Sequence, residues 1–547
     1  MVAAAAVVPR LWNLGHHPLW HDEAMEVLAA SCKCFPDRVL FYLVNLSFNE
    51  VVRVLVARGT SDAGLRLFPA LMSWACVPLV MAVARQSRAD HRETLIAGFL
   101  TAIAPLQIYY AGELRPYAVV TALALASHLL LGIAREKPGR AALAGWIAVS
   151  AFGAFTQGFP VFLAIQLAGV WRDIALSSPG EPNARRRLVA TAIAGTALLV
   201  LSFVATAAYA VVFRNHLMRI ESYSGIPGHT VAAWYLGFLF GEPYLGVLGA
   251  AAALSGMIAA IRQHRHTVAL WTVVGFAASV MVFRYVATTK FSIRFWAPIQ
   301  PFLFVFAATA LSAMSRRSRA HATAIGIVLA FWTAANVHGI VRIQARPAKD
   351  VAAFDTRRDA AWLRSESDGI AGYLLPDLYV VSLLRAFRFD QDDRPVYLST
   401  VYPDYAAILF GDITSAPCPP PRPTTGGSWV VFEQPVPFHR EDVPFTNDLT
   451  PWWTVQPEEW SPGGAPRLVT HEELATIWFA DPGHGAGERR IVRWIDAPAG
   501  RRTCFVVEAW RKARWNFLKY VPGYGLDVTS MTGPPVDTAR CSDSGAP

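Results

Sequence analysis

The feature that most constrains this chain is a series of apolar runs long enough to cross a membrane. A spanning α-helix needs about 20 apolar residues, and such runs recur up to residue 343. Charged residues make up 16% of the sequence, whereas a typical soluble domain has about 25%. A multi-pass α-helical membrane protein is therefore expected. The predicted spans are residues 65–84, 92–111, 116–134, 140–156, 158–172, 188–213, 238–261, 267–284, 294–314 and 321–343.

The first eight residues, 1–8, are apolar but too short to cross a bilayer. We expect them to be the end of a first transmembrane helix whose beginning is missing. This truncated helix brings the total to about eleven spans. A short interfacial anchor is the alternative. Residues 140–156 and 158–172 are also short, so they form either a tight hairpin or one broken helix.

Basic residues indicate how the spans are oriented. They occur in short clusters between the apolar runs, and the clusters fall on every second loop. Because Lys and Arg are enriched in cytoplasmic loops, we place this side in the cytoplasm. The net charge of +9 is spread over these clusters, so no nucleic-acid partner is expected. The clusters are Arg85, Arg88 and Arg92; Arg135, Lys137 and Arg140; Arg172 and Arg185–Arg187; Arg262 and Arg265; and Arg316, Arg317 and Arg319.

The composition becomes polar and mixed after Arg342. We therefore divide the chain into a transmembrane domain, residues 1–344, and an extracytoplasmic soluble α/β domain, residues 345–547. The tail from Met531 is expected to be disordered, and the cysteines of this domain allow a disulfide whose pairing the sequence does not specify. The expected elements are a helix at residues 356–367 and strands at 372–375, 428–432 and 503–507.

Two adjacent carboxylates, Asp22 and Glu23, lie in the first predicted outer loop, which covers about residues 10–64. Residues 25–60 of this loop have the spacing of amphipathic helices that lie along a membrane surface. The carboxylates can act as a base, as metal ligands or as the N-terminal charge of a helix. As a simple helix cap, Asp22 would contribute about 1 kcal/mol. The pair alone does not separate these alternatives.

The second predicted outer loop contains Tyr109-Tyr110-Ala111-Gly112-Glu113-Leu114-Arg115-Pro116-Tyr117. An acid and an arginine two residues apart can orient a hydroxyl and bind a phosphate, because the guanidinium is planar and always charged. Tyrosine and arginine are also common at lipid boundaries, so an interfacial anchor is the alternative. Lys290 and Arg294 lie in a later outer loop, where phosphate binding competes with simple snorkelling at a helix end.

The order of the motifs makes a more specific prediction. Arg10-Leu11-Trp12-Asn13-Leu14-Gly15 is followed by Leu19-Trp20-His21-Asp22-Glu23-Ala24 and then by the Tyr110–Tyr117 segment. This order resembles the GT-C superfamily of membrane glycosyltransferases, in particular the bacterial relatives of protein O-mannosyltransferases and of lipid A aminoarabinose transferases. The resemblance covers roughly residues 1–345.

The resemblance implies an activity. Members of the family take a sugar from a polyprenyl-phosphate carrier, or a polyprenyl-diphosphate one, and transfer it on the outer face to a hydroxyl acceptor. The resemblance to bacterial members also implies a location in a bacterial plasma membrane. The acceptor here would be a glycan, lipid or protein of the cell envelope, and the membrane lipid is a further partner. The sequence does not specify the sugar, so both hexosyl and pentosyl transfer remain open. The resemblance specifies no cofactor, and a divalent cation held by Asp22 and Glu23 stays open.

The resemblance also implies residue roles. Asp22 would be the general base, and Glu23 would support the loop or help to bind acceptor or metal. Arg115 would lie near the carrier phosphate, with Glu113 and Tyr117 in the same motif. Lys290 and Arg294 match the later phosphate-holding residues of the family only loosely.

One element departs from the family pattern. Many relatives have a Thr-His-Tyr element at the outer end of a middle helix, where this chain has Thr156-Gln157-Gly158-Phe159. Gln157 cannot titrate, so a proton or metal role at this position is absent. The competing hypothesis is therefore a catalytically degenerate protein that binds lipid phosphate or acts in envelope assembly as a scaffold or transporter. Transporters usually place ionisable residues near the bilayer midplane and often contain repeats, neither of which is evident here.

Overall fold

The computed structural model describes two compact units. The first comprises residues 1–17, 40–346 and 440–459, and the second comprises residues 18–39, 347–439 and 460–547. The described residues are 2–16, 19, 23, 24, 26, 27, 30, 45–136, 139–176, 182–212, 236, 237, 239–241, 243–263, 267–286, 293–345, 356–365, 370–376, 396–400, 413–414, 428–431, 467–469, 489–496 and 502–509.

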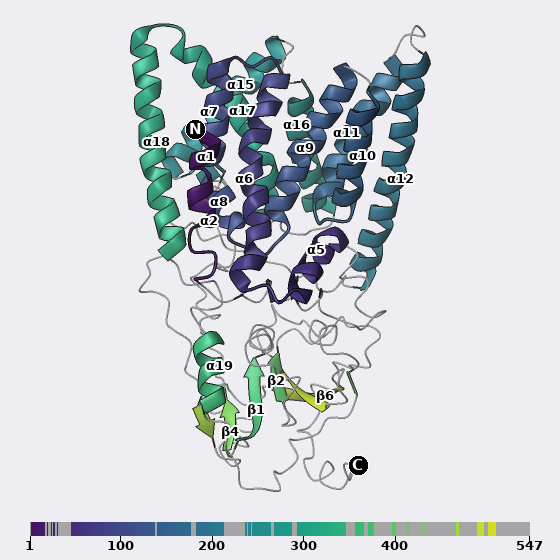
Figure 1. Ribbon diagram of the computed structural model, residues 1–547, viewed down its shortest axis with the longest axis vertical. Coiled ribbons are helices and arrows are strands. Elements are labelled where there is room, and N and C mark those ends of the chain that lie inside the picture. The colour runs from purple at the N-terminus through teal and green to yellow at the C-terminus, as the bar shows by residue number, and fades with distance from the viewer. Residues whose placement is uncertain are drawn as a thin grey trace. The chain divides into compact units, whose positions relative to one another are not determined.

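The first unit is a bundle of helices (Figure 1). Its helices are α1 (Val2–Ala5), α2 (Val7–Leu11), α5 (Leu46–Ala57), α6 (Asp62–Gln86), α7 (His91–Ala102), α8 (Pro105–Ala111), α9 (Tyr117–Glu136), α10 (Arg140–Ala154), α11 (Phe159–Leu176), α12 (Pro182–Val212), α15 (Pro243–Arg262), α16 (Thr267–Val286), the 3₁₀-helix η1 (Ile293–Ile299), α17 (Gln300–Ser315) and α18 (Arg319–Ala345).

Each predicted apolar run coincides with helical structure in this unit. Among the described residues, six helices are long and apolar enough to cross a membrane, or seven if the bent pair α7 and α8 forms one span. The multi-pass prediction is confirmed, whereas the count of eleven spans stays a prediction. Of the two alternatives for residues 140–172, the structure has two helices, α10 and α11, joined by a short turn.

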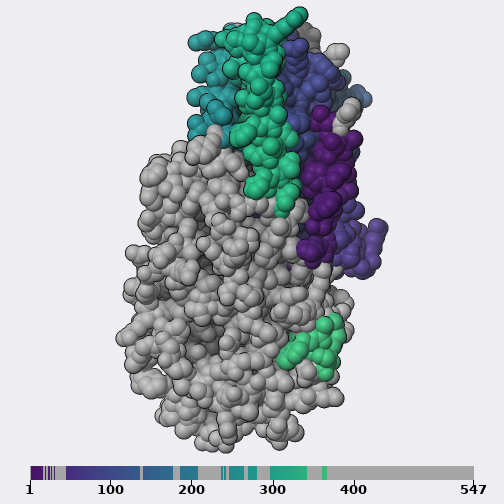
Figure 2. Space-filling view, turned by 90° about the vertical axis from the view of Figure 1, so that its left-hand side faces the viewer, coloured from purple at the N-terminus to yellow at the C-terminus, as the bar shows by residue number. Residues whose placement is uncertain are grey.

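Two long helices present apolar side chains outwards. In Figure 1, α12 and α18 lie at opposite flanks of the bundle. Figure 2 shows α18 next to α1 and α2 on one face. Large exposed apolar residues in a soluble protein are usually scattered, but here they follow the helices, as expected for contact with lipid. On α12 they are Ile193, Val200, Leu201, Phe203 and Val204, and on α18 they are Ile327, Phe331, Val337 and Val341.

The second unit contains helix α19 (Thr356–Ser365) and a seven-stranded mixed sheet with the order β3-β6-β7-β2-β1-β4-β5. Parallel pairs join β1 to β2, β1 to β4 and β2 to β7, and the remaining neighbours are antiparallel. The expected helix and the three expected strands lie on α19, β1, β4 and β7. The division into a membrane and an extracytoplasmic domain stays a prediction. The strands are β1 (Ile370–Pro376), β2 (Val396–Thr400), β3 (Ile413–Thr414), β4 (Ser428–Val431), β5 (Arg467–Val469), β6 (Arg489–Asp496) and β7 (Arg502–Ala509).

The run predicted as one span over residues 92–111 is broken. Helices α7 and α8 meet at an angle of 52°. Pro105 begins α8 and has no N–H, so the carbonyl of Thr101, four residues earlier, loses its helical donor. In apolar surroundings each such carbonyl must find another donor. The break therefore requires a donor from elsewhere in the fold.

Arg10 supplies that donor from α2. Its side chain is buried, with 1% of its surface exposed. One terminal nitrogen donates to the Thr101 carbonyl at 2.9 Å. The other donates to the Ala102 carbonyl at 2.9 Å and to the Ala6 carbonyl at 3.0 Å. Nε donates to Ser73 Oγ on α6 at 3.0 Å. The flat, forked guanidinium thus joins the first helices to α6 and to the break.

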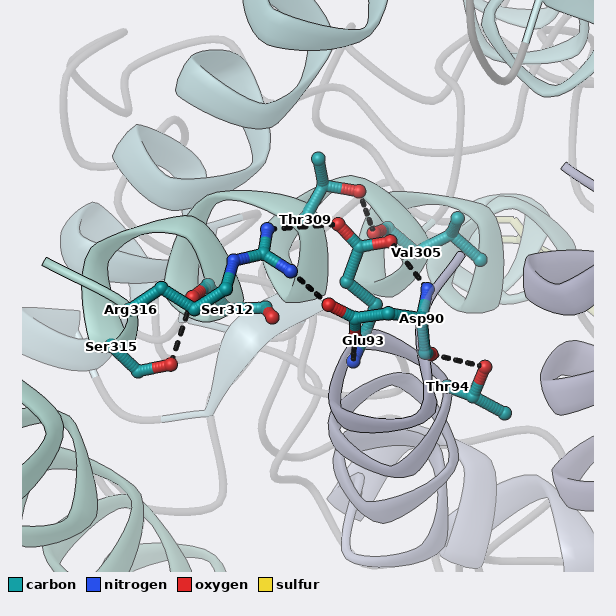
Figure 3. A network of polar contacts seen from close by, with 8 residues as sticks. All are labelled: Asp90, Glu93, Thr94, Val305, Thr309, Ser312, Ser315 and Arg316. Atoms are coloured by element: carbon teal, nitrogen blue, oxygen red, sulfur yellow. Dashed lines mark hydrogen bonds and ion pairs between the residues drawn. The ribbon is translucent and has the colours of Figure 1, made fainter. Parts of the chain in front are cut away.

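The opposite end of α7 is fixed by a capping box. Asp90 accepts a hydrogen bond from the Glu93 backbone N–H at 2.8 Å, and the Glu93 carboxylate accepts one from the Asp90 N–H at 3.2 Å. Figure 3 shows Arg316, at the end of α17, reaching Asp90 and Glu93. This ion pair ties the α6–α7 turn to the α17–α18 turn.

A second ion pair joins Arg135 of α9 to Asp173 of α11 at 2.9 Å. Like the Arg316 pair, it joins two of the helix ends that carry basic clusters. In each ion pair, the two joined clusters therefore lie at the same end of the bundle, as their position on every second loop predicts. Which side of a membrane these ends face stays a prediction.

The Arg10 contacts lead to a testable prediction. Arg10→Met should lower the free energy of unfolding by about 1–3 kcal/mol for each carbonyl left without a donor. Arg10→Lys should give a smaller loss, because an ammonium lacks the planar fork. Thermal unfolding of the detergent-solubilised protein measures the effect.

The control is Arg53→Met, because Arg53 is exposed and forms an ion pair with Glu50, three residues earlier on α5. The account is wrong if Arg10→Met and Arg53→Met unfold at the same temperature.

The capping box leads to a second prediction. Asp90→Ala should lower the free energy of unfolding by about 1 kcal/mol through loss of the cap. It should also remove the ion pair with Arg316, which at an exposed site contributes about 0.2–1 kcal/mol. Arg316→Ala should lose only the free energy contributed by the ion pair, because the cap remains. High salt should reduce the difference between wild type and Arg316→Ala. Equal losses in the two variants, measured by chemical unfolding, would contradict the assigned role of the cap.

Candidate functional site

The loop between α8 and α9 brings together three of the residues predicted to bind a donor phosphate. The Arg115 N–H donates to the Glu113 carbonyl at 2.8 Å, which makes the loop tight. Pro116 precedes α9, where its fixed φ suits the helix start and its missing N–H has little cost. Glu113 and Tyr117 are buried, and Arg115 is half-buried. The loop therefore holds Arg115 at a fixed place with the residue partly exposed.

Aromatic rings support this arginine. The guanidinium carbon of Arg115 lies 5.7 Å from the centre of the Tyr117 ring, within cation–π range. A terminal nitrogen of Arg115 lies 3.5 Å from the Tyr117 hydroxyl oxygen. The Tyr117 ring packs 4.9 Å from the ring of Tyr110, which in turn lies 5.0 Å from Tyr109, centre to centre. The tyrosines of α8 thus fix the surface on which the guanidinium rests.

Gln107 links α8 to the segment that contains Arg294. Its side-chain amide donates to the Ala297 carbonyl of η1 at 2.8 Å and to Gln300 Oε1 at 3.0 Å. Pro301 lies four residues after Ala297 and cannot donate a hydrogen bond to its carbonyl. Gln107 therefore has the same function at η1 as Arg10 has at the α7–α8 break.

The same arrangement occurs a third time. The Gln300 amide donates to the Leu239 carbonyl at 2.6 Å, and Pro243 lies four residues after Leu239. Ser73 connects two of these contacts, since its hydroxyl donates to the Gln107 carbonyl at 2.9 Å and accepts from Arg10 Nε. A buried polar chain thus runs from α2 through α6, α8 and α17 to the segment before α15. We call these linked residues the polar chain: Arg10, Ser73, Gln107 and Gln300.

The element that departs from the family pattern is also anchored. Oδ1 of Asn45, just before α5, accepts a hydrogen bond from the Gln157 backbone N–H at 2.9 Å. The Ser47 N–H donates to the Phe155 carbonyl at 3.3 Å. Gly158 has φ +90°, a conformation that glycine adopts without strain. These contacts fix the α10–α11 turn against the first-loop helix α5.

The predicted site residues are only partly covered by the structure. Glu113, Arg115 and Tyr117 come together in one loop, as expected. Asp22 and Lys290 lie outside the described residues.

Two further predicted residues, Glu23 and Arg294, lie within the described residues. Glu23 is helical and fully buried, and it belongs to the second unit. Arg294 lies in η1, but its side chain is outside the description. The catalytic pair Asp22 and Glu23 therefore stays a prediction. Within the described ranges, no group of three or more His, Cys, Asp or Glu side chains could hold a metal ion.

Sequence reasoning missed the roles of Ser73, Gln107 and Gln300. From the sequence alone, Arg10 is only the first residue of the Arg10–Gly15 motif. A signal was nevertheless available, because Thr101, Leu239 and Ala297 each lie four residues before a proline and polar side chains interrupt the neighbouring apolar runs. Such side chains in an apolar span usually bond to other groups.

No family model matches the chain, and no curated protein matches it. Solved structures do align with it. The apo form of ArnT from Cupriavidus metallidurans aligns with a TM-score of 0.50 and 15% sequence identity, covering 74% of this chain and 86% of ArnT. ArnT bound to undecaprenyl phosphate aligns with a TM-score of 0.51 and 14% identity, covering 79% of this chain and 92% of ArnT.

An apo oligosaccharyltransferase from Archaeoglobus fulgidus aligns with a TM-score of 0.45 and 12% identity, covering 71% of this chain and 63% of that protein. The likeness to ArnT shows the fold of the chain. It is the fold of GT-C membrane glycosyltransferases, as the order of the sequence motifs predicts.

Proposed function

We propose that this protein is a membrane glycosyltransferase that moves a sugar from a polyprenyl-phosphate or polyprenyl-diphosphate carrier to a hydroxyl of a cell-envelope glycan, lipid or protein. The observation that carries the proposal is the half-buried Arg115, held over Tyr117 in a chain with the fold of ArnT. ArnT has been solved with undecaprenyl phosphate bound, a ligand whose phosphate is the group that an arginine fork recognises.

The arginine loop suits a phosphate leaving group. When the bond between the sugar and the carrier breaks, negative charge accumulates on the carrier phosphate. A preorganised cation stabilises that charge without reorganising at the moment of reaction. Arg115 supplies the cation, and Tyr117 holds it in place. Lys290 and Arg294 are the candidates for further phosphate contacts.

The attacking hydroxyl needs a base. Asp22 fills this role in our proposal and contributes about 10²–10⁴-fold to the rate. A single displacement with one carboxylate base inverts the configuration at the anomeric carbon. Glu23 supports the loop, or holds acceptor or a divalent cation together with Asp22.

The arginine loop lies at the start of α9, and the Arg135–Asp173 ion pair lies at its end. Because basic clusters mark the cytoplasmic side, the loop faces the outer side of the plasma membrane in our proposal. The C-terminal domain is then extracytoplasmic and available to bind the acceptor.

Binding of undecaprenyl phosphate to the purified protein in nanodiscs tests the role of Arg115. Arg115→Ala should weaken binding by about tenfold or more, because a charge-assisted hydrogen-bond partner of the phosphate is lost. The control is Arg58→Ala, which removes an exposed arginine at the end of α5. Equal affinities for Arg115→Ala and wild type would remove Arg115 from the phosphate site.

Sugar transfer by the Asp22→Asn variant tests the chemistry. In membranes supplied with labelled polyprenyl-phosphate sugars, this variant should retain lipid-phosphate binding and lose at least about 10²-fold of the transfer rate. Full residual transfer would exclude Asp22 as the base. Binding without transfer in the wild type as well would favour a lipid-phosphate binding protein over an enzyme.

A further inference from the structure

We propose that Gln107 is a positioning residue that sets the spacing between the arginine loop and η1, so that both serve one lipid phosphate. This inference rests on the proposed function. It concerns a side chain that carries no charge and lies outside the donor motif. Its contacts are the reason to assign it a role in substrate binding as well as in folding.

The first contact is with η1. The Gln107 amide is 1% exposed and donates to the Ala297 carbonyl at 2.8 Å. Because Pro301 cannot donate to that carbonyl, the amide takes the place of a helical N–H. Removing the amide would leave a buried carbonyl without its donor, and η1 would have to move to find another. The position of η1, and with it the backbone of Arg294, therefore depends on Gln107.

The second contact fixes the other end of the link. The Ser73 hydroxyl donates to the Gln107 backbone carbonyl at 2.9 Å, and Ser73 is itself held by Arg10. Gln107 lies two residues before Tyr109 on the short helix α8, which leads directly into the arginine loop. Gln107 thus connects α8, which leads into the loop of Arg115, to η1, which contains Arg294.

The third contact prevents the amide from rotating. Gln107 Nε2 also donates to Gln300 Oε1 at 3.0 Å, while the Gln300 amide donates to the Leu239 carbonyl. Both glutamine side chains are thereby oriented by partners that lie on different segments. The spacing between α8 and η1 is therefore defined by directional hydrogen bonds, whereas apolar packing alone would tolerate sliding.

The test is Gln107→Leu, which keeps a similar side-chain size and removes the amide. A matched control exists in Gln166→Leu. Gln166 is also buried, accepts from Trp146 Nε1 at 2.8 Å and donates to Ser127 Oγ at 2.8 Å. It lies on α11, and its side-chain hydrogen bonds among the described residues go to α10 and α9, not to α8 or η1. The two variants should lose similar stability, since each breaks two buried side-chain hydrogen bonds.

Affinity for undecaprenyl phosphate separates the two variants. In nanodiscs, Gln107→Leu should raise the Kd by about tenfold or more through misplacement of the phosphate-binding groups, whereas Gln166→Leu should leave the Kd unchanged. A purely structural role predicts similar losses of stability and unchanged affinity in both. Equal Kd values for the two variants would overturn the inference.

A second variant tests whether the Ala297 carbonyl needs a donor. It also keeps the inference testable if Gln107→Leu fails to fold. Pro301→Ala restores an N–H at the position from which a helix would bond the Ala297 carbonyl. The double variant Gln107→Leu/Pro301→Ala should therefore regain part of the lost affinity. If Gln107→Leu does not accumulate in membranes, the double variant should. A double variant that accumulates and binds no better than Gln107→Leu, or that does not bind at all, would overturn the inference.

The wild-type result separates this inference from the proposed function. Absence of undecaprenyl phosphate binding by wild-type protein would contradict the proposed function itself. Binding by wild type, with equal affinities for Gln107→Leu and Gln166→Leu, would contradict only the role of Gln107.

Discussion

The fold depends on one constraint, which is that a backbone carbonyl in apolar surroundings must receive a hydrogen bond. Prolines at 105, 243 and 301 each remove the helical donor for a carbonyl four residues earlier. Arg10, Gln300 and Gln107 replace those donors with side-chain N–H groups. Breaks in membrane helices are tolerated where neighbouring groups satisfy the freed backbone. Here the neighbours belong to one continuous polar chain, so the breaks support one another.

The breaks also explain where the candidate site can form. An unbroken helix over residues 92–111 would continue straight to its end, whereas the 52° bend redirects α8 and the loop that follows it. That loop contains Glu113, Arg115 and Tyr117. The segment that contains Arg294 is the 3₁₀-helix η1, which contains Pro298 and is followed directly by α17. Both candidate phosphate-binding segments thus follow from interrupted helices whose backbone groups are satisfied by the polar chain.

Much of this architecture was predictable from the sequence. Apolar runs predicted the membrane helices, because the hydrocarbon layer sets their length, and the motif order predicted the GT-C fold. The loop containing Arg115 was also identified. The bend at α7–α8 was not, since hydropathy alone does not register a break inside an apolar run.

The partners in the polar chain were beyond sequence reasoning for a different reason. Arg10 and Thr101 are 91 residues apart, and Gln107 and Gln300 are 193 residues apart. Which side chain donates to which freed carbonyl depends on the packing of the whole bundle. The prolines identify the carbonyls that lack a helical donor, and the polar residues in neighbouring spans identify possible donors. The sequence does not show which donor bonds which carbonyl. The relation of Asp22 to the arginine loop is likewise a prediction from motif order alone.

The central claim is that the chain transfers a sugar to an envelope acceptor. Mass spectrometry of envelope glycans, lipids and proteins from a strain lacking the protein tests it most directly, because a missing sugar identifies donor and acceptor together. We predict that one glycan, lipid or protein loses a single sugar residue in that strain and regains it when the wild-type chain is restored. An envelope with the same sugars on its glycans, lipids and proteins in the presence and absence of the protein would contradict the account.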